Sequence, residues 1–185
     1  MENREEAFFD LVHSLQNGYY AGRMTQGNER LAFVMVMVAV TKQSVPQVLK
    51  IQRNHFVHNN AVCLLRIHTA RANNLRRIIM PEFMWGYVTE YCNKFHVTEE
   101  GLLFPFNPEY VGNRVREVAK IKHYDISVRD IMKLIPYRVK TAMYQDKVKE
   151  YVGLLYSIPL DEVYSCDTST IICDNIVRFM ETNLI

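Results

Sequence analysis

Cysteine is scarce in this sequence, and its few positions are scattered. Four cysteines occur among 185 residues, and no two of them form a Cys-x-x-Cys pair. In a chain of this length, such spacing indicates the reduced thiols of an intracellular protein and excludes a dense disulfide framework. Cysteine and histidine also lack two ligand pairs at zinc-site spacing. We therefore expect no metal site and no cofactor.

Long apolar runs are missing as well. The longest, Leu31 to Val40, has ten residues, about half of the roughly 20 that a membrane-spanning helix needs. We interpret it as a buried core helix. The first residues, Met1 to Glu6, are too acidic for a signal or transit peptide. The sequence thus predicts a soluble, cytoplasmic (intracellular) protein without a membrane partner.

Proline and glycine are too few and too dispersed to mark a linker. The chain has six prolines and seven glycines, and it contains no repeat or low-complexity tract. A chain of this size ordinarily closes around one core. Residues 1–185 are therefore expected to form a single domain.

Apolar periodicity predicts a mainly helical chain. Helices are expected at about 5–16, 29–41, 44–52, 81–94, 108–122, 127–145, 146–157 and 168–182. Two strands are expected at 61–68 and 75–80, joined by a turn at 71–74. A loop is expected at 22–27 and a short extended piece at 102–105. This order predicts an α+β fold, mainly helical, with a small β-hairpin and a C-terminal helix.

Charge is distributed unevenly along the chain. Residues 1–41 carry 3 basic and 5 acidic residues, residues 42–150 carry 18 and 10, and residues 151–185 carry 1 and 5. The net charges are therefore −2, +8 and −4. A basic middle between acidic ends favours one face built for a polyanion such as nucleic acid. The alternative is that ordinary solvated helix faces are rich in lysine and arginine here.

Two basic clusters are the candidate nucleic-acid contacts. The first lies on and around the hairpin and comprises Arg66, Arg71, Arg76 and Arg77. The second comprises Arg129, Lys133, Arg138 and Lys140. Arginine suits phosphates because its planar fork donates two hydrogen bonds at once.

Spacing sorts the members of these clusters. Arg76 and Arg77 are adjacent on a strand, so at most one of them shares a face with Arg66. Arg129 and Lys133 are four residues apart and lie on one helix face. A third basic run, residues 114–122, alternates with apolar residues and is interpreted as a plain amphipathic helix.

Histidines and aromatic residues are given structural roles. His55, His58 and His68 have no second ligand at helical or hairpin spacing. The aromatic residues could stack on bases, but core and boundary packing is the preferred interpretation for Tyr19, Tyr20, Phe83, Trp85, Tyr87 and Tyr91.

Four stretches carry a family-like pattern. They are Val38 to Ile51 (VAVTKQSVPQVLKI), Val62 to Pro81, Gly101 to Pro105 (GLLFP) and Ile126 to Lys133 (ISVRDIMK). In that order they resemble the box T-G-x-R-x-x-E-l-x-x-L, the β-hairpin, the l-F-p strand and the box i-t-p-H-d-L-R-h of tyrosine recombinase (phage integrase-like) catalytic domains. The resemblance extends over about residues 8–170. It is strongest to short members such as fimbrial phase-variation invertases.

The resemblance implies a degenerate site. In active members, two arginines clamp the scissile phosphate, a lysine and a histidine move protons, and a tyrosine attacks phosphorus. The arginine positions read Ser44 and Met132 here, the histidine position reads Arg129, and the hairpin lysine falls at His68. Tyr164 lies near the place of the nucleophile. Since loss of one stabilising donor costs on the order of 100- to 1000-fold, the resemblance implies an inactive member and no enzyme.

We therefore expect a non-catalytic protein that binds double-stranded DNA. The role would be that of a transcriptional regulator or an accessory factor of a mobile element, phage or plasmid. Residues 168–185 would form a C-terminal helix that packs in cis or mediates self-association. Two alternatives stay open: a divergent but active site-specific recombinase, and a helical protein-interaction adaptor whose basic middle docks an acidic partner.

Overall fold

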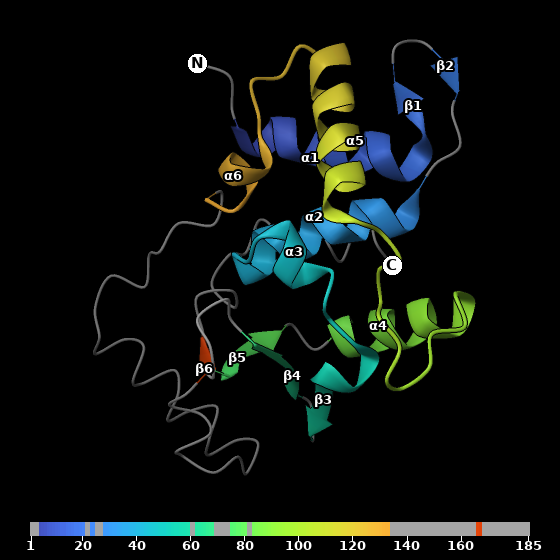
Figure 1. Cartoon of the computed structure of the whole chain (residues 1–185), viewed down its shortest axis with the longest axis vertical. Helices are drawn as coiled ribbons and strands as arrows, with labels where there is room; N and C mark the ends of the chain where they lie inside the picture. Colours follow the sequence, from blue (N-terminus) through green and yellow to red (C-terminus); the bar gives the residue numbers. More distant parts are fainter. Residues whose placement is uncertain are drawn as a thin grey trace. The chain divides into compact units, whose positions relative to one another are not determined.

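A computed structural model describes residues 4–20, 23–24, 28–59, 62–68, 75–80, 83–133 and 166–167. The chain divides into two compact units, Met1–Lys50 with Phe104–Ile135, and Ile51–Leu103 with Pro136–Ile185. Each unit is described by itself (Figure 1). The expectation of one domain over residues 1–185 stays a prediction.

The first unit begins with helix α1 (Arg4–Asn17). Its buried residues, including Phe8, Leu11, Val12 and Leu15, recur every three or four positions and form one apolar stripe. Gly18 ends the helix with a φ of 69°, a conformation that glycine adopts without steric cost.

A short ladder follows the first helix. Strands β1 (Tyr19–Tyr20) and β2 (Arg23–Met24) pair antiparallel, with Tyr19 opposite Met24. The prediction of a loop over residues 22–27 is therefore wrong at 23–24, where β2 forms. The strands are too short for alternation to signal them.

Helix α2 (Glu29–Thr41) is the centre of the first unit. Asn28 caps its start, where the side-chain oxygen accepts a hydrogen bond from the Leu31 N–H at 3.0 Å. Every residue from position 31 to position 41 is buried. The structure confirms the predicted core helix and both of its ends.

The next helix is shorter than expected. Helix α3 (Val45–Val48) ends four residues before the predicted end at residue 52. Beyond it the chain becomes extended, because the Ile51 carbonyl accepts from the Leu103 N–H at 2.9 Å and Gln52 forms a β-bridge with Leu102. A long-range contact thus overrides local helix propensity.

Helices α5 (Pro108–Ile121) and α6 (Val128–Ile131) complete the described part of the first unit. α5 buries one stripe, which consists of Val111, Val115, Val118 and Ala119. It is fixed to α1 by Asp10, whose carboxylate accepts from the Tyr124 hydroxyl at 2.9 Å and pairs with Lys122 at 3.1 Å. α6 begins the predicted helix over 127–145, whose remainder lies outside the described residues. So do the predicted helices over 146–157 and 168–182.

The second unit is built on a four-stranded sheet. The order is β3 (Phe56–Asn59), β4 (Val62–His68), β5 (Leu75–Met80) and β6 (Cys166–Asp167), with β6 parallel to β5 and the other pairs antiparallel. A 3₁₀ turn, η1 (Arg53–His55), precedes it, and helix α4 (Phe83–Lys94) follows β5. The predicted hairpin is confirmed, whereas β3 and β6 were not expected.

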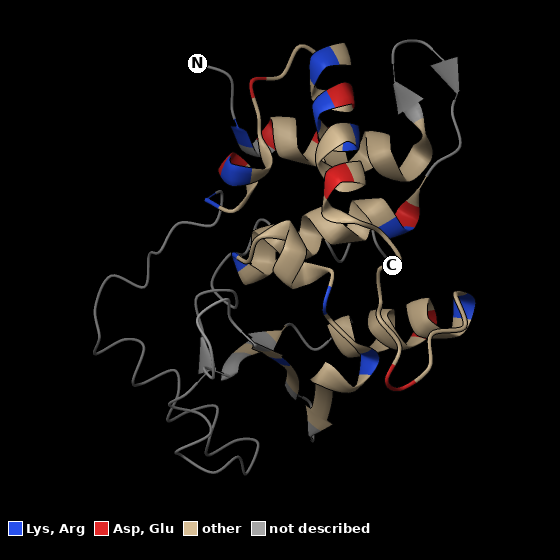
Figure 2. Cartoon of the chain, in the orientation of Figure 1, with Lys and Arg blue, Asp and Glu red and all other residues tan. Residues whose placement is uncertain are grey.

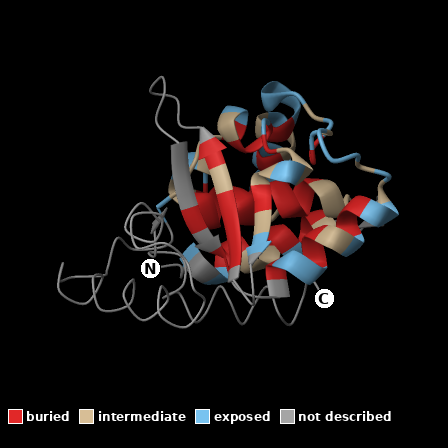
Figure 3. Ribbon diagram, turned by 90° about the horizontal axis from the view of Figure 1, so that it is seen from below, coloured by how far each residue is buried: buried red, intermediate tan, exposed pale blue. Residues whose placement is uncertain are grey.

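The core of this unit comes from the sheet and α4. Leu65 and Ile78 are fully buried on the sheet, as are Met84 and Tyr91 on α4. Figure 3 shows buried residues on both the strands and the helices. The Tyr91 hydroxyl donates to the Leu103 carbonyl at 2.9 Å, so this buried polar group is satisfied. The structure confirms a mainly helical α+β fold with a small sheet. In the described part of the chain, every helix is too short or too polar to span a membrane.

Candidate nucleic-acid interface

The hairpin cluster lies in the second unit, on strands β4 and β5. In the ladder, Arg66 is the partner of Arg77 and Ile67 is the partner of Arg76. Residues directly opposite in an antiparallel pair share a face. The structure thus resolves which of the two neighbouring arginines belongs with Arg66: it is Arg77. Arg71 and the side chains at 76 and 77 lie outside what the structure describes.

The second cluster begins on α6, in the first unit. Arg129 and Lys133 are both exposed. α6 ends at Ile131, so Arg129 lies on the helix and Lys133 lies two residues beyond it. A helix face shared by the two residues stays a prediction. Arg138 and Lys140 lie outside the described residues.

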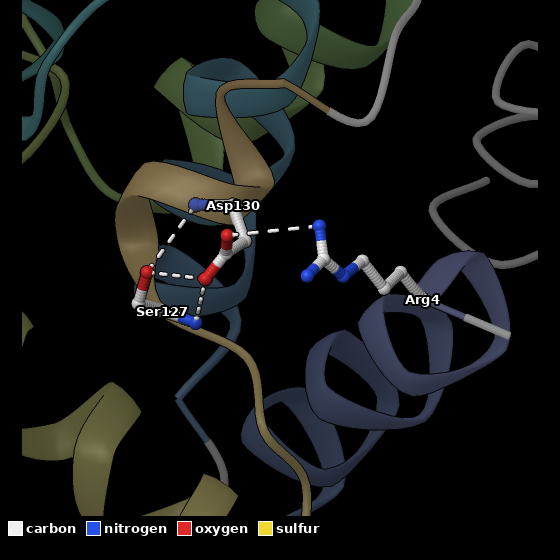
Figure 4. Close-up of polar contacts among 3 residues, drawn as sticks. All are labelled: Arg4, Ser127 and Asp130. Carbon is white, nitrogen blue, oxygen red and sulfur yellow. Dashed lines mark hydrogen bonds and ion pairs between the residues drawn. The ribbon is translucent and has the colours of Figure 1, made fainter. Parts of the chain in front are cut away.

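A capping box fixes the start of α6 (Figure 4). The Asp130 carboxylate accepts from the Ser127 backbone N–H at 2.9 Å and from the Ser127 hydroxyl. The Asp130 backbone N–H donates back to the Ser127 hydroxyl at 3.3 Å. An arginine of α1 also reaches this carboxylate, with Arg4 Nη1 at 3.9 Å from Asp130 Oδ1.

These contacts lower the pKa of the Asp130 carboxyl. The largest cause is the side-chain hydrogen bond from Ser127, followed by the Ser127 backbone hydrogen bond, with smaller effects of Arg4 and Lys133. Each favours the charged form of the carboxyl. The capping box, with its charged Asp130 carboxylate, therefore fixes the first turn of α6, on which Arg129 lies.

Two local features agree with the register of the resemblance. Lys42 directly follows α2, and its φ of 54° and ψ of 28° place it in the left-handed region. In the T-G-x-R pattern, this position is occupied by glycine. Glycine is the residue that this conformation favours. Ser127 is the N-cap of α6 and Val128 is its first residue. These two residues stand at the t and the p of the pattern i-t-p-H-d-L-R-h. Proline is preferred at the first position of a helix, so the helix start agrees with the pattern.

The left-handed Lys42 was not singled out in the sequence. The signal that could have found it is the mismatch itself, because a lysine stands where the pattern has glycine. The buried Thr41 supports the same turn, since its hydroxyl donates to the Met37 carbonyl at 2.6 Å and accepts from the Gln43 N–H at 3.3 Å.

The two positions that would hold the catalytic arginines, Ser44 and Met132, are also in the first unit. Ser44 is the N-cap residue of α3 and is half-buried, and the described residues give its side chain no capping hydrogen bond. Met132 is half-buried at the C-terminus of α6. Neither side chain can carry a positive charge. Tyr164 and the side chain of His68 lie outside the described part.

The basic run on α5 has ordinary surface partners. Arg114 pairs with Glu117 at 2.6 Å, and Arg116 donates to the Asn113 side chain at 2.7 Å and to the Gly112 carbonyl at 3.3 Å. Figure 2 shows basic and acidic residues interspersed along this helix. This supports the interpretation of an amphipathic helix with a solvated face.

The structure describes part of the histidine and aromatic set that was given structural roles. The side chains of Tyr19, Tyr20, His68 and Phe83 lie outside the described residues. His55 Nδ1 accepts from the Gln52 N–H at 3.2 Å, and Tyr87 and Tyr91 are buried. Trp85 differs from these two tyrosines, since it is 36% exposed and stacks on His58 with ring centroids 5.2 Å apart. The described residues contain no group of three or more His, Cys, Asp or Glu side chains placed to hold a metal ion.

Sequence comparisons give no family for this chain. No family model matches it, and no curated protein matches it.

Solved structures do show similarity. A pre-cleavage complex of the XerH site-specific recombinase with its difH substrate matches with a TM-score of 0.51 and 12% identity, over 89% of this chain and 48% of the recombinase chain. A post-cleavage complex of XerH with a palindromic difH substrate matches with a TM-score of 0.51 and 13% identity, over 100% and 52% of the two chains. The chain spans about half the length of these recombinase chains. Its fold resembles that of a tyrosine recombinase catalytic domain.

Proposed function

We propose that this chain is a DNA-binding protein that uses the fold of a tyrosine recombinase catalytic domain without the cleavage chemistry. Its role is that of a transcriptional regulator or an accessory factor of a mobile genetic element, phage or plasmid. It binds double-stranded DNA through the two basic clusters. One is the hairpin cluster (Arg66, Arg71, Arg76 and Arg77), and the other is the α6 cluster (Arg129, Lys133, Arg138 and Lys140).

The observation that carries the proposal is the identity of the residues at two helix ends. Ser44 immediately precedes α3 and Met132 immediately follows α6, where the resemblance expects the two arginines that clamp a scissile phosphate. The left-handed backbone at Lys42 and the N-cap at Ser127 support this alignment of the chain with the family pattern. Without cationic donors, negative charge on a transition-state phosphate is not stabilised, so we infer that binding is retained and cleavage is not.

DNA binding is supported by charge and by fold. Arg129 is exposed on α6 and Lys133 is exposed two residues beyond its end, and long basic side chains of this kind neutralise phosphates. The structurally similar XerH recombinase is bound to a DNA substrate in both complexes. An adaptor that docks an acidic protein could use the same charges, so the test has to separate the two partners.

The first experiment measures binding of labelled duplex DNA across a salt series. Tight binding that weakens steeply with salt, with preference for fragments flanking the protein's own gene over random sequence, supports a regulator. The double variant Arg129→Gln/Lys133→Gln should lower the slope of log K against log salt by about 1 for each phosphate that it no longer neutralises.

The matched control is Arg116→Gln/Lys120→Gln. This pair is also exposed and four residues apart, but it lies on α5, so its salt slope should stay that of the wild type. Equal losses in both double variants would indicate attraction by net charge alone. Absence of DNA binding at about 50 mM salt would favour a protein partner.

The second experiment tests cleavage. The protein is incubated with duplex DNA, denatured and examined for a covalent adduct. We expect none. An adduct that disappears in Tyr164→Phe would overturn the proposal in favour of a divergent active recombinase, because covalent capture by tyrosine is the step that such enzymes require.

A further inference from the structure

The only tryptophan of the chain belongs to an exposed aromatic pair in the second unit. Trp85 stands in the first turn of α4, and His58 stands on β3, the first strand in the order of the sheet. Their rings are nearly parallel, with an interplanar angle of 15° and centroids 5.2 Å apart. His58 is exposed, and Trp85 is 36% exposed. The imidazole therefore supports the indole, while part of the indole stays open to solvent.

The helix surface next to Trp85 carries no side chain. Gly86 is exposed, and a Cβ atom placed on it would meet nothing within 4 Å. Glycine destabilises a helix relative to alanine, and the packing around position 86 does not require it. A flat ligand can therefore approach Trp85 without a side chain at position 86 in its way.

The surroundings of Trp85 favour a small planar ligand over a protein partner. Among the described residues of the second unit, Leu102 is the one other exposed large apolar side chain. A stable protein interface buries about 800 Å² on each side, which one partly exposed ring and one leucine do not supply. A nucleobase needs only a flat aromatic surface, because every base has a π face. The other exposed residues of α4 between positions 84 and 94 are Gly86, Glu90, Asn93 and Lys94.

We propose that Trp85, supported by His58, stacks on one unpaired base of the bound DNA. The inference rests on the proposed function, and it adds a base contact to the phosphate contacts of the two basic clusters. A paired base inside a duplex is already stacked on both sides, so this ring selects DNA in which a base is unpaired, such as a bulge, a junction or a single-stranded end. Stacking tolerates any base, so the preference concerns the structure of the DNA and not its sequence.

The test compares labelled DNAs that share one duplex sequence. The first is fully paired, the second has a bulge of a few unpaired thymidines, and the third has abasic residues in that bulge. The full chain should bind the thymidine bulge about 5- to 150-fold more tightly than the abasic bulge, which is the range expected for stacking of one base. Because Trp85 is the only tryptophan, the thymidine bulge should also quench the tryptophan fluorescence more strongly than the abasic bulge does at saturation.

Variants identify the ring that makes the contact. Trp85→Leu should remove the difference in affinity between the thymidine and abasic bulges and keep the wild-type affinity for the paired duplex, whereas Trp85→Phe should keep part of the difference. The matched control is Tyr110→Leu, which removes a 43% exposed ring that stacks on Phe106 in the first unit. It should keep the whole difference. Thermal unfolding checks the fold of each variant, and if Trp85→Leu unfolds, the fluorescence of the wild type still decides.

The outcomes separate the stacking contact from the proposed function. Equal affinity of the wild type for the two bulges, or equal tryptophan fluorescence in both complexes, would overturn the stacking contact while binding of the paired duplex leaves the proposed function intact. An equal loss in Tyr110→Leu and Trp85→Leu would overturn the stacking contact as well. Quenching by the thymidine bulge without binding of the paired duplex would support the contact and contradict the proposed function. A wild type that binds none of these DNAs overturns both.

Discussion

Ser127 and Asp130 hold each other's backbone at the start of α6. The Ser127 N–H donates to the Asp130 carboxylate at 2.9 Å, and the Asp130 N–H donates to the Ser127 hydroxyl at 3.3 Å. The two residues are three positions apart in sequence. Their side chains together satisfy two backbone N–H groups that would otherwise have no hydrogen-bond partner at the start of a helix.

Loss of this cap should destabilise the protein. Ser127→Ala removes one side-chain partner, and N-cap substitutions of this kind cost about 1 kcal/mol. The free energy of unfolding is measured by urea titration. The control is Ser44→Ala, at the N-cap of α3, where the described residues give the side chain no capping bond. Its effect should be smaller, and equal losses would contradict a specific role of the capping box.

Stability should depend on the charge of Asp130 in acid. Ser127, and to a lesser extent Arg4, lower the pKa of this carboxyl in the folded chain. A lowered pKa gives a contribution that is complete above the ordinary carboxyl pKa of about 3.9 and is lost as pH falls through the folded value. Wild type should therefore exceed Asp130→Asn in stability near neutral pH.

The pH series provides the measurement for that prediction. Urea midpoints of wild type and Asp130→Asn are compared from about pH 7 down to about pH 3, across the carboxyl range. The difference between the two proteins should narrow below about pH 4. A difference that stays constant through this range would show that the charge of Asp130 is not its source.

Lys42→Gly should stabilise the chain. Lys42 has φ 54° and ψ 28°, a conformation that costs an L-residue about 1–2 kcal/mol. Glycine removes that cost but loses more backbone entropy on folding, about 0.5–1 kcal/mol, so the net gain should lie between about 0 and about 1.5 kcal/mol. Lys120→Gly, on the exposed side of α5, should instead lose about 1 kcal/mol. Destabilisation by both would contradict the backbone explanation.

Cys63 and Cys92 should be inert toward thiol reagents in the native protein. They are 0% and 1% exposed, and burial, the largest cause, raises the pKa of the Cys92 thiol. Both effects suppress the reactive thiolate. The experiment uses Cys166→Ser/Cys173→Ser, which leaves only these two thiols. Labelling should occur only after unfolding, and rapid labelling of the native protein at about pH 8 would contradict the described core.

The sequence predicted elements whose signal is local. The apolar run in α2 and the short apolar stretches of β4 and β5 on either side of a turn signal are enough to specify the type of each element. The sequence also reduced the possible partners of Arg66 to one of two neighbours. It could not choose between them, because the choice depends on ladder register, which involves residues on another strand.

Elements fixed by distant residues could not be predicted. β3 is four residues long and contains polar residues, and β6 is two residues long and pairs with a strand far away in sequence. The end of α3 is set by pairing with residues near position 102. The left-handed conformation of Lys42 could not be predicted, because lysine rarely adopts a positive φ.

The complete burial of α2 has a consequence for how this sequence can change over time. A helix with one solvated side can exchange charged residues there at little cost, as α5 can, whereas α2 has no such side between residues 31 and 41. Thr41 is accommodated there because its hydroxyl donates to the Met37 carbonyl, whereas a charged or amide side chain would leave unsatisfied polar atoms in the core. Descendants of this protein that keep the fold should therefore vary α2 only among apolar residues of similar volume, even where the surface clusters have diverged beyond recognition.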